Sequence, residues 1–330
     1  MKSRFFLAFF SFLPIFSFAE IPLHFSLEPY FAYSQGQINE LLYDEWHSGR
    51  ILSSLEWDRN LFLIGVDSAC SFGRLNLSVD FSSSVPQDSG NMQDSDWMNQ
   101  SAPQMRTTYS CGTNEAVQNY DTNLSLSFDF FPFNSADERV LVFSPMAQVQ
   151  YAYDSFERTK AKGWYGQGTY SSDSKNHWWY EEEAKRFPVT YWNDSKGRYV
   201  TQRLAGVSFS QHIFSTFIGA KIAARVSKRL SFDFSALFSP FSYTEFTDTH
   251  HGSETRYSHA GRNFWKQAKY SFGGDFAFSK RLSLNLSGSI FSFQRTKGTF
   301  YIDGIKDYAH KNGTGRFSMT AKAGIRVKVL

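Results

Sequence analysis

Two short acidic motifs, far apart in the chain, contain the residue types needed to activate a water molecule. Asp94 and Asp96 lie in the segment GNMQDSDWM, and Asp248 and His250 lie in FTDTHH. In an extended chain, residues two positions apart project to the same face, so each motif can present both of its side chains together. Adjacent carboxylates tend to share a proton, and a carboxylate beside a histidine orients the imidazole and makes it a better base. On spacing alone, the alternative for the DxD motif is a solvated or calcium-binding loop.

Together the two motifs define a hydrolytic mechanism. Asp248 would orient His250, and His250 would take a proton from a water molecule that Asp94 also holds. Asp96 would tune the charge of the carboxylate pair, and the water would attack a peptide carbonyl. On spacing alone, Asp94, Asp96, Asp248 and His250 are only candidate catalytic residues, and the assignment also requires that the fold bring both motifs to one place.

Alternating apolar and polar residues predict the strands that must position these motifs. Aromatic residues make up 18% of the chain, with 35 Phe, and many stand at every second position. The last alternating segment is the clearest, because its polar face carries Arg, Ser, Thr, Lys and Gly. Its apolar face consists of Phe317, Met319, Ala321, Ala323, Ile325, Val327 and Val329. Similar segments occur at 75–81, 124–130, 230–238 and 282–290.

This alternation predicts a membrane barrel rather than a soluble sandwich. In a barrel, lipid-facing and lumen-facing side chains alternate, and ~9–11 residues of each strand cross the bilayer. A sandwich would need its apolar faces to meet in one core, and it would not need so many segments of that length. After the N-terminal segment, no apolar run is long enough for a membrane-spanning helix, and the mean hydropathy is −0.39. The predicted fold is an all-β, antiparallel transmembrane barrel.

The N-terminal segment has the features of a secretory signal peptide. Two basic residues, Lys2 and Arg4, precede an apolar stretch that ends in the small-x-small cleavage pattern Ser17-Phe18-Ala19. A membrane anchor is the alternative, but the apolar stretch is short and contains a proline. We expect residues 1–19 to be a signal peptide and residues 20–330 to form one barrel domain outside the cytoplasm.

Short and long connections alternate along the chain. Short turns are expected at 71–74, 134–138, 227–229 and 279–281, and the last two share the sequence SKRLS. Longer polar loops are expected at roughly 35–49, 84–120, 158–197, 248–262 and 298–312. Counting one strand on each side of every connection gives about ten strands, an even number that returns both ends of the chain to one side. Both acidic motifs then fall in long loops at the same end of the barrel.

Beyond these patterns, the chain resembles the omptin family of outer-membrane proteases over essentially its whole mature length. The segment NELLYDEWHSGRILSSLEWD, at 39–58, is similar to an omptin stretch in the order and spacing of its acidic residues, its Tyr, its Gly-Arg pair and its acidic-Trp pair. GNMQDSDWM, at 90–98, differs from the family form only at variable positions, and the later DTH also matches. The resemblance implies an outer-membrane endopeptidase with its site at the extracellular mouth of the barrel.

The same resemblance implies roles for individual residues and for partners. The four catalytic positions of the family correspond to Asp94, Asp96, Asp248 and His250, and the acidic floor of its specificity pocket corresponds to Glu40. Substrates would be peptides or proteins at the cell surface, cut beside basic residues, and the barrel would sit in outer-membrane lipid.

Departures from the family pattern concern specificity and lipid binding. The second acid of the specificity pocket is replaced by Phe246, and the adjacent Glu245 should project the other way. The positions that bind lipopolysaccharide in the family are occupied here by Val149, Tyr151 and Tyr153, which would bind phosphate poorly. We therefore expect a relaxed preference for basic residues and no lipopolysaccharide site.

The remaining candidates indicate no cofactor, no metal and no nucleic-acid partner. His250, His251 and His259 lack the spacing of a zinc motif. Ser110 has no evident base that would make it a nucleophile. The formal net charge of +3 is too small to imply a polyanionic partner.

A non-enzymatic barrel is the rival interpretation. Long aromatic loops and the missing acid at Phe246 would suit an adhesin, a receptor for a host protein or a small pore. That interpretation leaves unexplained why all four catalytic positions are intact.

Overall fold

The computed structural model describes residues 23–45, 49–98, 103, 106, 108–134, 140–165, 191–193, 198–200 and 206–329. The predicted signal peptide, residues 1–19, and the first residues of the predicted barrel domain lie outside these ranges. Among the described residues, no helix is long and apolar enough to cross a membrane.

The regular elements of the described residues are β-strands. They are β1 (Leu23–Asp44), β2 (Arg50–Asp58), β3 (Leu61–Phe72), β4 (Leu75–Ser84), β5 (Gln87–Asp96), β6 (Thr108–Phe128), β7 (Phe130–Asn134), β8 (Val140–Tyr165), β9 (Tyr191–Asn193), β10 (Arg198–Val200), β11 (Val207–Arg225), β12 (Leu230–His250), β13 (Thr255–Asn263), β14 (Gln267–Ala277), β15 (Leu282–Phe293), β16 (Gly298–Ile302) and β17 (Ile305–Lys328).

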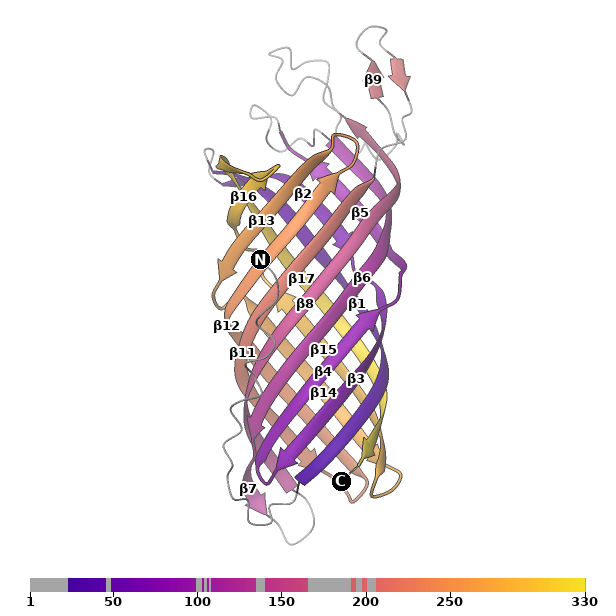
Figure 1. Ribbon diagram of the computed structural model, residues 1–330, viewed down its shortest axis with the longest axis vertical. Helices are drawn as coiled ribbons and strands as arrows, with labels where there is room; N and C mark the ends of the chain where they lie inside the picture. The colour runs from indigo at the N-terminus through magenta and orange to yellow at the C-terminus, as the bar shows by residue number, and fades with distance from the viewer. Residues whose placement is uncertain are drawn as a thin grey trace, which may run out of the picture.

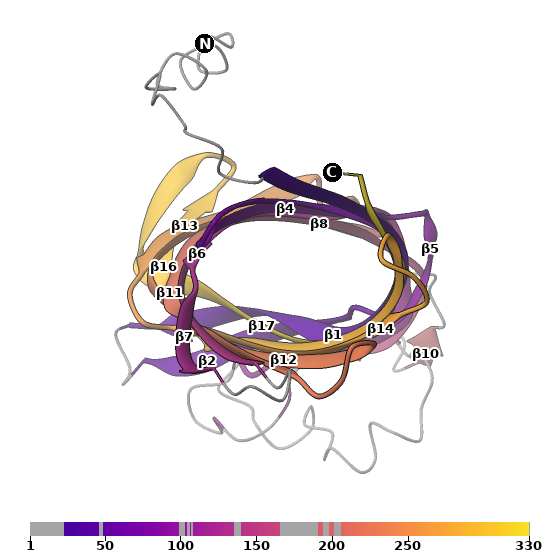
Figure 2. The same cartoon turned by 90° about the horizontal axis from the view of Figure 1, so that it is seen from below.

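The strands close into a ring of ten, when a strand that is interrupted part-way is counted once. For example, β2 and β3 both pair with β1, and β4 and β5 both pair with β6. The first and last strands close the ring, with Tyr30 opposite Gly324 and Glu40 opposite Thr314. Figure 1 shows the tilted strands from the side, and Figure 2 shows the ring, which is oval, along its axis. The predicted antiparallel barrel of about ten strands is confirmed.

Apolar side chains cover the outer face of the ring, as the alternation predicted. On β17, Phe317, Met319, Ile325 and Val327 are 40–47% exposed. A barrel in water would gain by burying such residues, whereas a barrel in a bilayer places them against lipid. The same outward belt recurs around the ring, and we call it the apolar belt; it includes Phe31 and Tyr33 on β1, Val79 and Phe81 on β4, Leu124 and Leu126 on β6, Phe232, Phe234 and Phe238 on β12, and Leu286 and Ile290 on β15.

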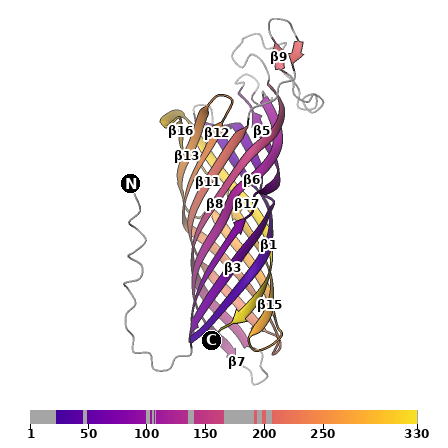
Figure 3. The ribbon, with the colours of Figure 1, turned by 45° about the vertical axis from the view of Figure 1, so that its right-hand side comes forward.

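Both copies of SKRLS form the same tight turn. Ser227 Oγ accepts hydrogen bonds from the backbone N–H groups of Arg229, at 3.2 Å, and Leu230, at 3.1 Å. Ser279 makes the same two bonds in the second copy. These turns lie at the end of the barrel where β17 also ends (Figure 3). The predicted short turns at 227–229 and 279–281 are therefore confirmed.

Much of the chain that we predicted as long loops is strand, which corrects the sequence analysis. At the end of the barrel away from the short turns, β1, β5, β6, β8 and β12 continue well past the apolar belt. Asp96 is the last residue of β5 and His250 the last residue of β12. The expectation failed because strands beyond the lipid need no apolar outer face, so their alternation is lost although their backbones still pair.

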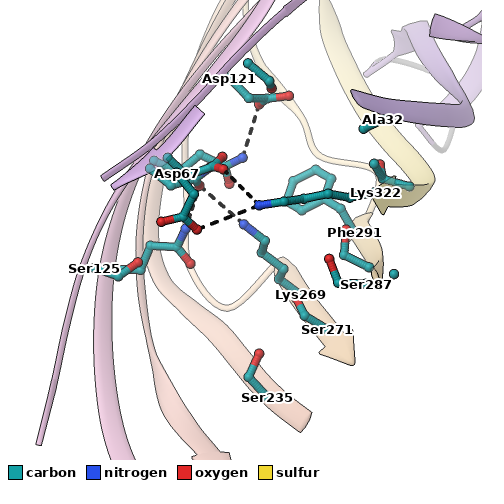
Figure 4. Close-up of a pocket in the computed structure, with 18 of the residues that line it drawn as sticks. Ala32, Asp67, Asp121, Ser125, Ser235, Lys269, Ser271, Ser287, Phe291 and Lys322 are labelled. Carbon is teal, nitrogen blue, oxygen red and sulfur yellow. Dashed lines mark hydrogen bonds and ion pairs between the residues drawn. The ribbon is translucent and has the colours of Figure 1, made fainter. Parts of the chain in front are cut away.

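The lumen is filled in layers, and β8 passes through all of them. Near the short-turn end, Gln148 and Gln150 line a polar cavity of about 320 Å³. Lys269 and Lys322 point into this cavity from other strands (Figure 4). Further along β8, Asp154 belongs to a layer of ion pairs, Phe156 to an aromatic layer, and Arg158 to the level of the acidic motifs.

The ion-pair layer consists of Arg59, Asp121, Asp154 and Arg316, and it ties distant strands together. Arg59 Nε donates to one oxygen of Asp154 at 2.8 Å, and an Arg316 nitrogen donates to the other at 3.0 Å. Both arginines also reach Asp121, at 3.3 and 3.4 Å. Because each buried charge in this layer has oppositely charged partners, the burial of these side chains is tolerated.

The aromatic layer consists of Trp57, Phe156, Phe209, Phe246 and His259. Trp57 stacks on Phe209 with ring centroids 5.3 Å apart, and Phe209 contacts Phe246 at 5.6 Å. Phe246 in turn stacks on His259 at 4.8 Å. Each side chain is almost completely buried, so this layer forms a floor inside the barrel directly below the acidic motifs.

Candidate functional site

The candidate site is built from three strands that reach the same end of the barrel. β5 carries Asp94 and Asp96, β12 carries Asp248 and His250, and β1 carries Glu40. Around the ring, β6, β8 and β11 separate β5 from β12, so the two motifs come from facing walls. In Figure 1 the label of β5 lies toward the end of the barrel opposite the C-terminus.

The Asp248–His250 motif forms a direct pair. His250 Nε2 lies 2.7 Å from Asp248 Oδ2, as the two-residue spacing in an extended strand predicted. The Asp248 side chain is 1% exposed, whereas the His250 side chain is 31% exposed. Since an ionised carboxylate only accepts hydrogen bonds, it favours the tautomer with the proton on Nε2 and leaves Nδ1 as the basic nitrogen. The ring of Tyr257, on β13, meets that of His250 edge to face at 5.1 Å.

The charge state of His250 is set by opposing influences. Burial lowers the pKa of His250, but the hydrogen bond to Asp248 and the charges of Asp248 and Asp94 outweigh it. The pKa of His250 is therefore raised above its ordinary value, and the histidine becomes a stronger base.

The two aspartates of β5 occupy different surroundings. Asp94 is buried, whereas Asp96 is half-buried at the strand end. Burial raises the pKa of Asp94, opposed first by the positive charge of Arg158 and then by that of His250. Burial and the charge of Asp94 raise the pKa of Asp96 to about 7, against hydrogen bonds from two nearby hydroxyl groups. The pair therefore titrates unevenly, with one carboxyl group holding a proton near neutral pH.

Charge interactions join the two motifs across the lumen. Asp94 and Asp96 are both influenced by His250, and Asp94 is also influenced by Asp248. Because the Coulomb energy falls with distance, these influences mean that the charges of the two facing motifs lie within electrostatic reach of each other.

Glu40 lies at the same place but is deeply buried. It is 4% exposed, and its Oε1 accepts a hydrogen bond from the amide of Asn312 on β17 at 3.3 Å. Burial raises the pKa of Glu40, and the negative charges of Asp248 and Asp94 raise it further. Within the described residues, its Oε2 has no hydrogen-bond partner. A positively charged group entering here would meet an acidic, unsatisfied acceptor.

Phe246 belongs to the aromatic layer and has no exposed surface. Two residues before Asp248 on β12, it points into the barrel, while Glu245 is exposed on the outer face beside Tyr243. The structure thus confirms that the Glu245 side chain projects away from the barrel interior. Burial lowers the pKa of His259, against which Phe246 stacks, to about 4, so this wall is uncharged at neutral pH.

Sequence reasoning missed Arg158 and considered Ser110 only as a nucleophile. Arg158, on β8, is 3% exposed and donates to Ser110 Oγ, on β6, at 2.7 Å. Arg158 continues the inward parity of Asp154 and Phe156 along β8. The alternation that turns Arg158 inward was visible in the sequence. Its position along the barrel axis relative to the opposite wall, however, is set by the pairing register of five strands.

The three histidines considered as a metal group do not converge. His259 is buried beneath the site in the aromatic layer, while His251 bonds to Ser208 at 3.0 Å on an exposed surface. His250 is held by Asp248.

The outer face of β8 carries aromatic rather than ionic groups at the positions considered for lipopolysaccharide. Tyr151 and Tyr153 both contact His212 on β11; the Tyr151 hydroxyl lies 2.8 Å from His212 Nδ1. Val149, on the same face, is exposed.

Comparison with solved structures identifies similar barrels. The crystal structure of the outer membrane protease OmpT from Escherichia coli matches with a TM-score of 0.74 at 15% sequence identity, covering 92% of this chain and 96% of that chain. The outer membrane protein OprG from Pseudomonas aeruginosa matches at 0.32 and 8% identity, over 92% of this chain and 95% of that one. Neisserial surface protein A matches at 0.25 and 10% identity, over 92% and 96%. Scores as low as these last two carry no weight for the fold.

Sequence comparison is more specific than the shape of the barrel. No curated protein matches this sequence. The model of the Omptin family, however, matches residues 21–328, almost the whole chain. That range includes all ten strands of the ring, both acidic motifs and Glu40. The chain therefore belongs to the Omptin family.

Proposed function

We propose that this protein is an outer-membrane endopeptidase that hydrolyses peptide bonds with a water molecule activated between Asp94 and His250. The observation that carries the proposal is the Asp248–His250 pair, held at 2.7 Å and electrostatically coupled to Asp94 on the facing wall. Membership of the Omptin family and the barrel shared with OmpT support an outer-membrane protease.

In the proposed reaction, His250 is the general base. Its Nδ1 takes a proton from the water, while Asp248 holds Nε2 and stabilises the imidazolium that forms. The water oxygen then bonds to the peptide carbonyl carbon. When the C–N bond breaks, His250 returns the proton to the leaving amine. Asp94 holds the water for attack, and Asp96 shares a proton within the aspartate pair and so limits its negative charge.

Glu40 is the proposed determinant of substrate preference. A Lys or Arg side chain of the substrate would pair with its buried carboxylate and so favour the charged state that burial opposes. Because Phe246 gives the neighbouring wall no charge, we propose a preference for basic residues that is weaker than two acids would provide.

We further propose that the site faces the cell exterior and acts on peptides or proteins there. The aromatic contacts of Tyr151 and Tyr153 with His212 support activity without lipopolysaccharide, since these residues and Val149 offer no arginine or lysine for phosphate.

Cleavage of a peptide library tests the proposal. Intact cells or refolded barrel should cleave peptides, and Asp94→Ala or His250→Ala should lower kcat/KM by about 100-fold to 10,000-fold. His251→Ala is the matched control for the histidine, because His251 is exposed and bonded to Ser208 outside the site. Asp88→Ala, on the exposed part of β5, is the control for the aspartate.

Heat-modifiable migration on gels must show that each variant still forms a barrel. Undiminished cleavage by folded Asp94→Ala and His250→Ala would refute the mechanism. A folded wild-type barrel that cleaves nothing but binds host proteins would instead support the adhesin or receptor interpretation.

A further inference from the structure

Arg158 is a buried cation at the level of the two acidic motifs. It lies on β8, where it pairs with Val207 of β11, and Val207 pairs with His250 of β12. Its side chain is 3% exposed and is hydrogen-bonded to a neighbouring side chain. We therefore consider how it acts through the residues that it contacts.

Arg158 reaches β5 through a serine. Its Nη1 donates to Ser110 Oγ at 2.7 Å, and the same nitrogen lies 3.7 Å from the sulfur of Met92. Ser110 has no exposed surface and stands directly opposite Asp94 in the β5–β6 register. The Ser110 side chain is also hydrogen-bonded to Asp94. Because its oxygen accepts from the guanidinium, its own hydrogen is available to donate to the carboxylate.

Asp96 occupies different surroundings from Asp94. Ser53 and Thr108 hydrogen-bond to its side chain, while burial and the charge of Asp94 raise its pKa. Asp94 is approached by a guanidinium and by a hydroxyl polarised by that guanidinium. Because these groups favour the charged form of Asp94, and a charged Asp94 disfavours the charged form of Asp96, the two carboxyl groups do not share a proton equally.

We infer that Arg158, acting through Ser110, is a positioning residue that keeps Asp94 as the ionised member of the aspartate pair and leaves the shared proton on Asp96. The inference rests on the proposed function, because it assigns charges within the proposed catalytic pair. Asp94 is then oriented and negatively charged when the water binds. It can therefore accept a hydrogen bond from one of the hydrogens of the water molecule.

Several charged groups face Asp94, and the inference must account for all of them. Arg158 from β8 and His250 from β12 stabilise its charge, whereas other carboxylates oppose it. The opposing groups are Asp248 of β12, Asp96 of β5 and Glu40 of β1. Arg158 is the largest favourable influence against burial on the pKa of Asp94, and it also lowers the pKa of His250. Both effects extend activity toward lower pH.

The test is the pH profile of kcat/KM for peptide cleavage by the refolded full-length barrel. In Arg158→Gln, Asp94 and His250 should both retain protons to higher pH, so the acidic limb should move upward by about one pH unit. Cleavage should fall about tenfold on that limb and recover toward wild type above it. In Arg158→Lys, the acidic limb should lie close to its wild-type position. In Ser110→Ala, the limb should move upward as in Arg158→Gln, but by a smaller amount.

Glu157→Gln is the matched control, because Glu157 precedes Arg158 on β8 but is exposed on the outer face. Its pH profile should equal that of the wild type. If Arg158→Gln does not fold, the Arg158→Lys and Ser110→Ala profiles decide the question. A folded Arg158→Gln or Ser110→Ala with an unchanged acidic limb would overturn the inference while leaving the proposed protease intact. Cleavage that survives Asp94→Ala would instead overturn the proposed function itself.

Discussion

At the scale of single residues, the proposed catalytic groups differ in what shifts their pKa. Burial and the charge of Asp94 raise the pKa of Asp96 to about 7, whereas the contacts with Asp248 raise the pKa of His250 against the effect of burial. A pKa of about 7 suits proton transfer near neutral pH, and the raised pKa makes His250 a stronger base. The DxD and DxH spacing predicted that each pair would share a face, but it could not predict which member of each pair is the more buried.

Asparagine substitutions should separate the roles of the two aspartates. Asn resembles a protonated Asp, so Asp96→Asn should lose least activity below pH 7, where Asp96 itself is protonated. Asp94→Asn removes the charge that we assign to the water-holding group and should lose about 100-fold or more in kcat/KM throughout. Peptide cleavage measured from pH 5.5 to 8.5 checks both expectations; equal losses in the two variants at every pH would contradict the assignment.

Glu40 should cost stability when it ionises. Because its folded-state pKa is raised, the folded protein favours the protonated carboxyl group, and stability falls as pH rises from the usual carboxyl range through that folded pKa. Because Gln cannot ionise, the Glu40→Gln variant does not lose this stability as pH rises. At pH 8 we expect the variant to be more stable by about 1–3 kcal/mol, with a smaller difference at pH 4.

The midpoint of heat-modifiable migration in detergent, measured at both pH values, tests this expectation. A Glu40→Gln barrel that is less stable than wild type at pH 8 would show that Glu40 is held by a partner in its charged form. The same variant should also weaken cleavage beside Lys and Arg, which connects the stability cost to substrate preference.

At the scale of elements, the site depends on strands that extend past the apolar belt and on the floor between them. Alternation along 124–130, 230–238 and 317–329 made the membrane-embedded strands predictable from sequence. Beyond the belt, as at Asp94 in β5, polar residues occupy both faces, and the chain resembles a loop although its backbone pairs with β2 and β6. The register that sets Arg158 beneath Asp94 comes from pairing between strands, which no local pattern reports.

The aromatic layer should be essential for holding these walls together. Trp57→Ala removes a fully buried ring that stacks on Phe209 and Phe156, and we expect a loss of about 3–5 kcal/mol in unfolding free energy together with weaker cleavage. Phe232→Ala, on the outer face of β12 and 49% exposed, is the matched control and should cost much less in detergent. Equal losses in urea unfolding would mean that the layer is not a structural floor.

At the scale of the whole molecule, a barrel is what allows motifs distant in sequence to meet. The ring has an oval cross-section (Figure 2), and β6, β8 and β11 separate β5 from β12 around it. Buried side chains of the aromatic and ion-pair layers fill the lumen. The family resemblance anticipated this architecture and the four candidate residues. It could not predict a role for Arg158, because Arg158 lies outside the matched motifs and its contacts are known only from the folded structure.

Lipid dependence is a property of the whole barrel in its membrane. With Tyr151 and Tyr153 packed around His212 on the outer face, we expect full peptide cleavage in phosphatidylcholine vesicles free of lipopolysaccharide. Adding purified lipopolysaccharide should change kcat/KM by less than about twofold, whereas an enzyme inactive until it is added would contradict this expectation. Peptide added outside intact cells should be cleaved as well, since the site is proposed to face outward.

The most direct test of the central claim is a double-mutant cycle on peptide cleavage with Asp94→Ala, His250→Ala and the combined variant. If both residues act on one water molecule, removing the second after the first should cost little, and the combined loss in kcat/KM should be close to the larger single loss. Losses that multiply in a correctly folded barrel would show that Asp94 and His250 act independently, and the shared-water account would be wrong.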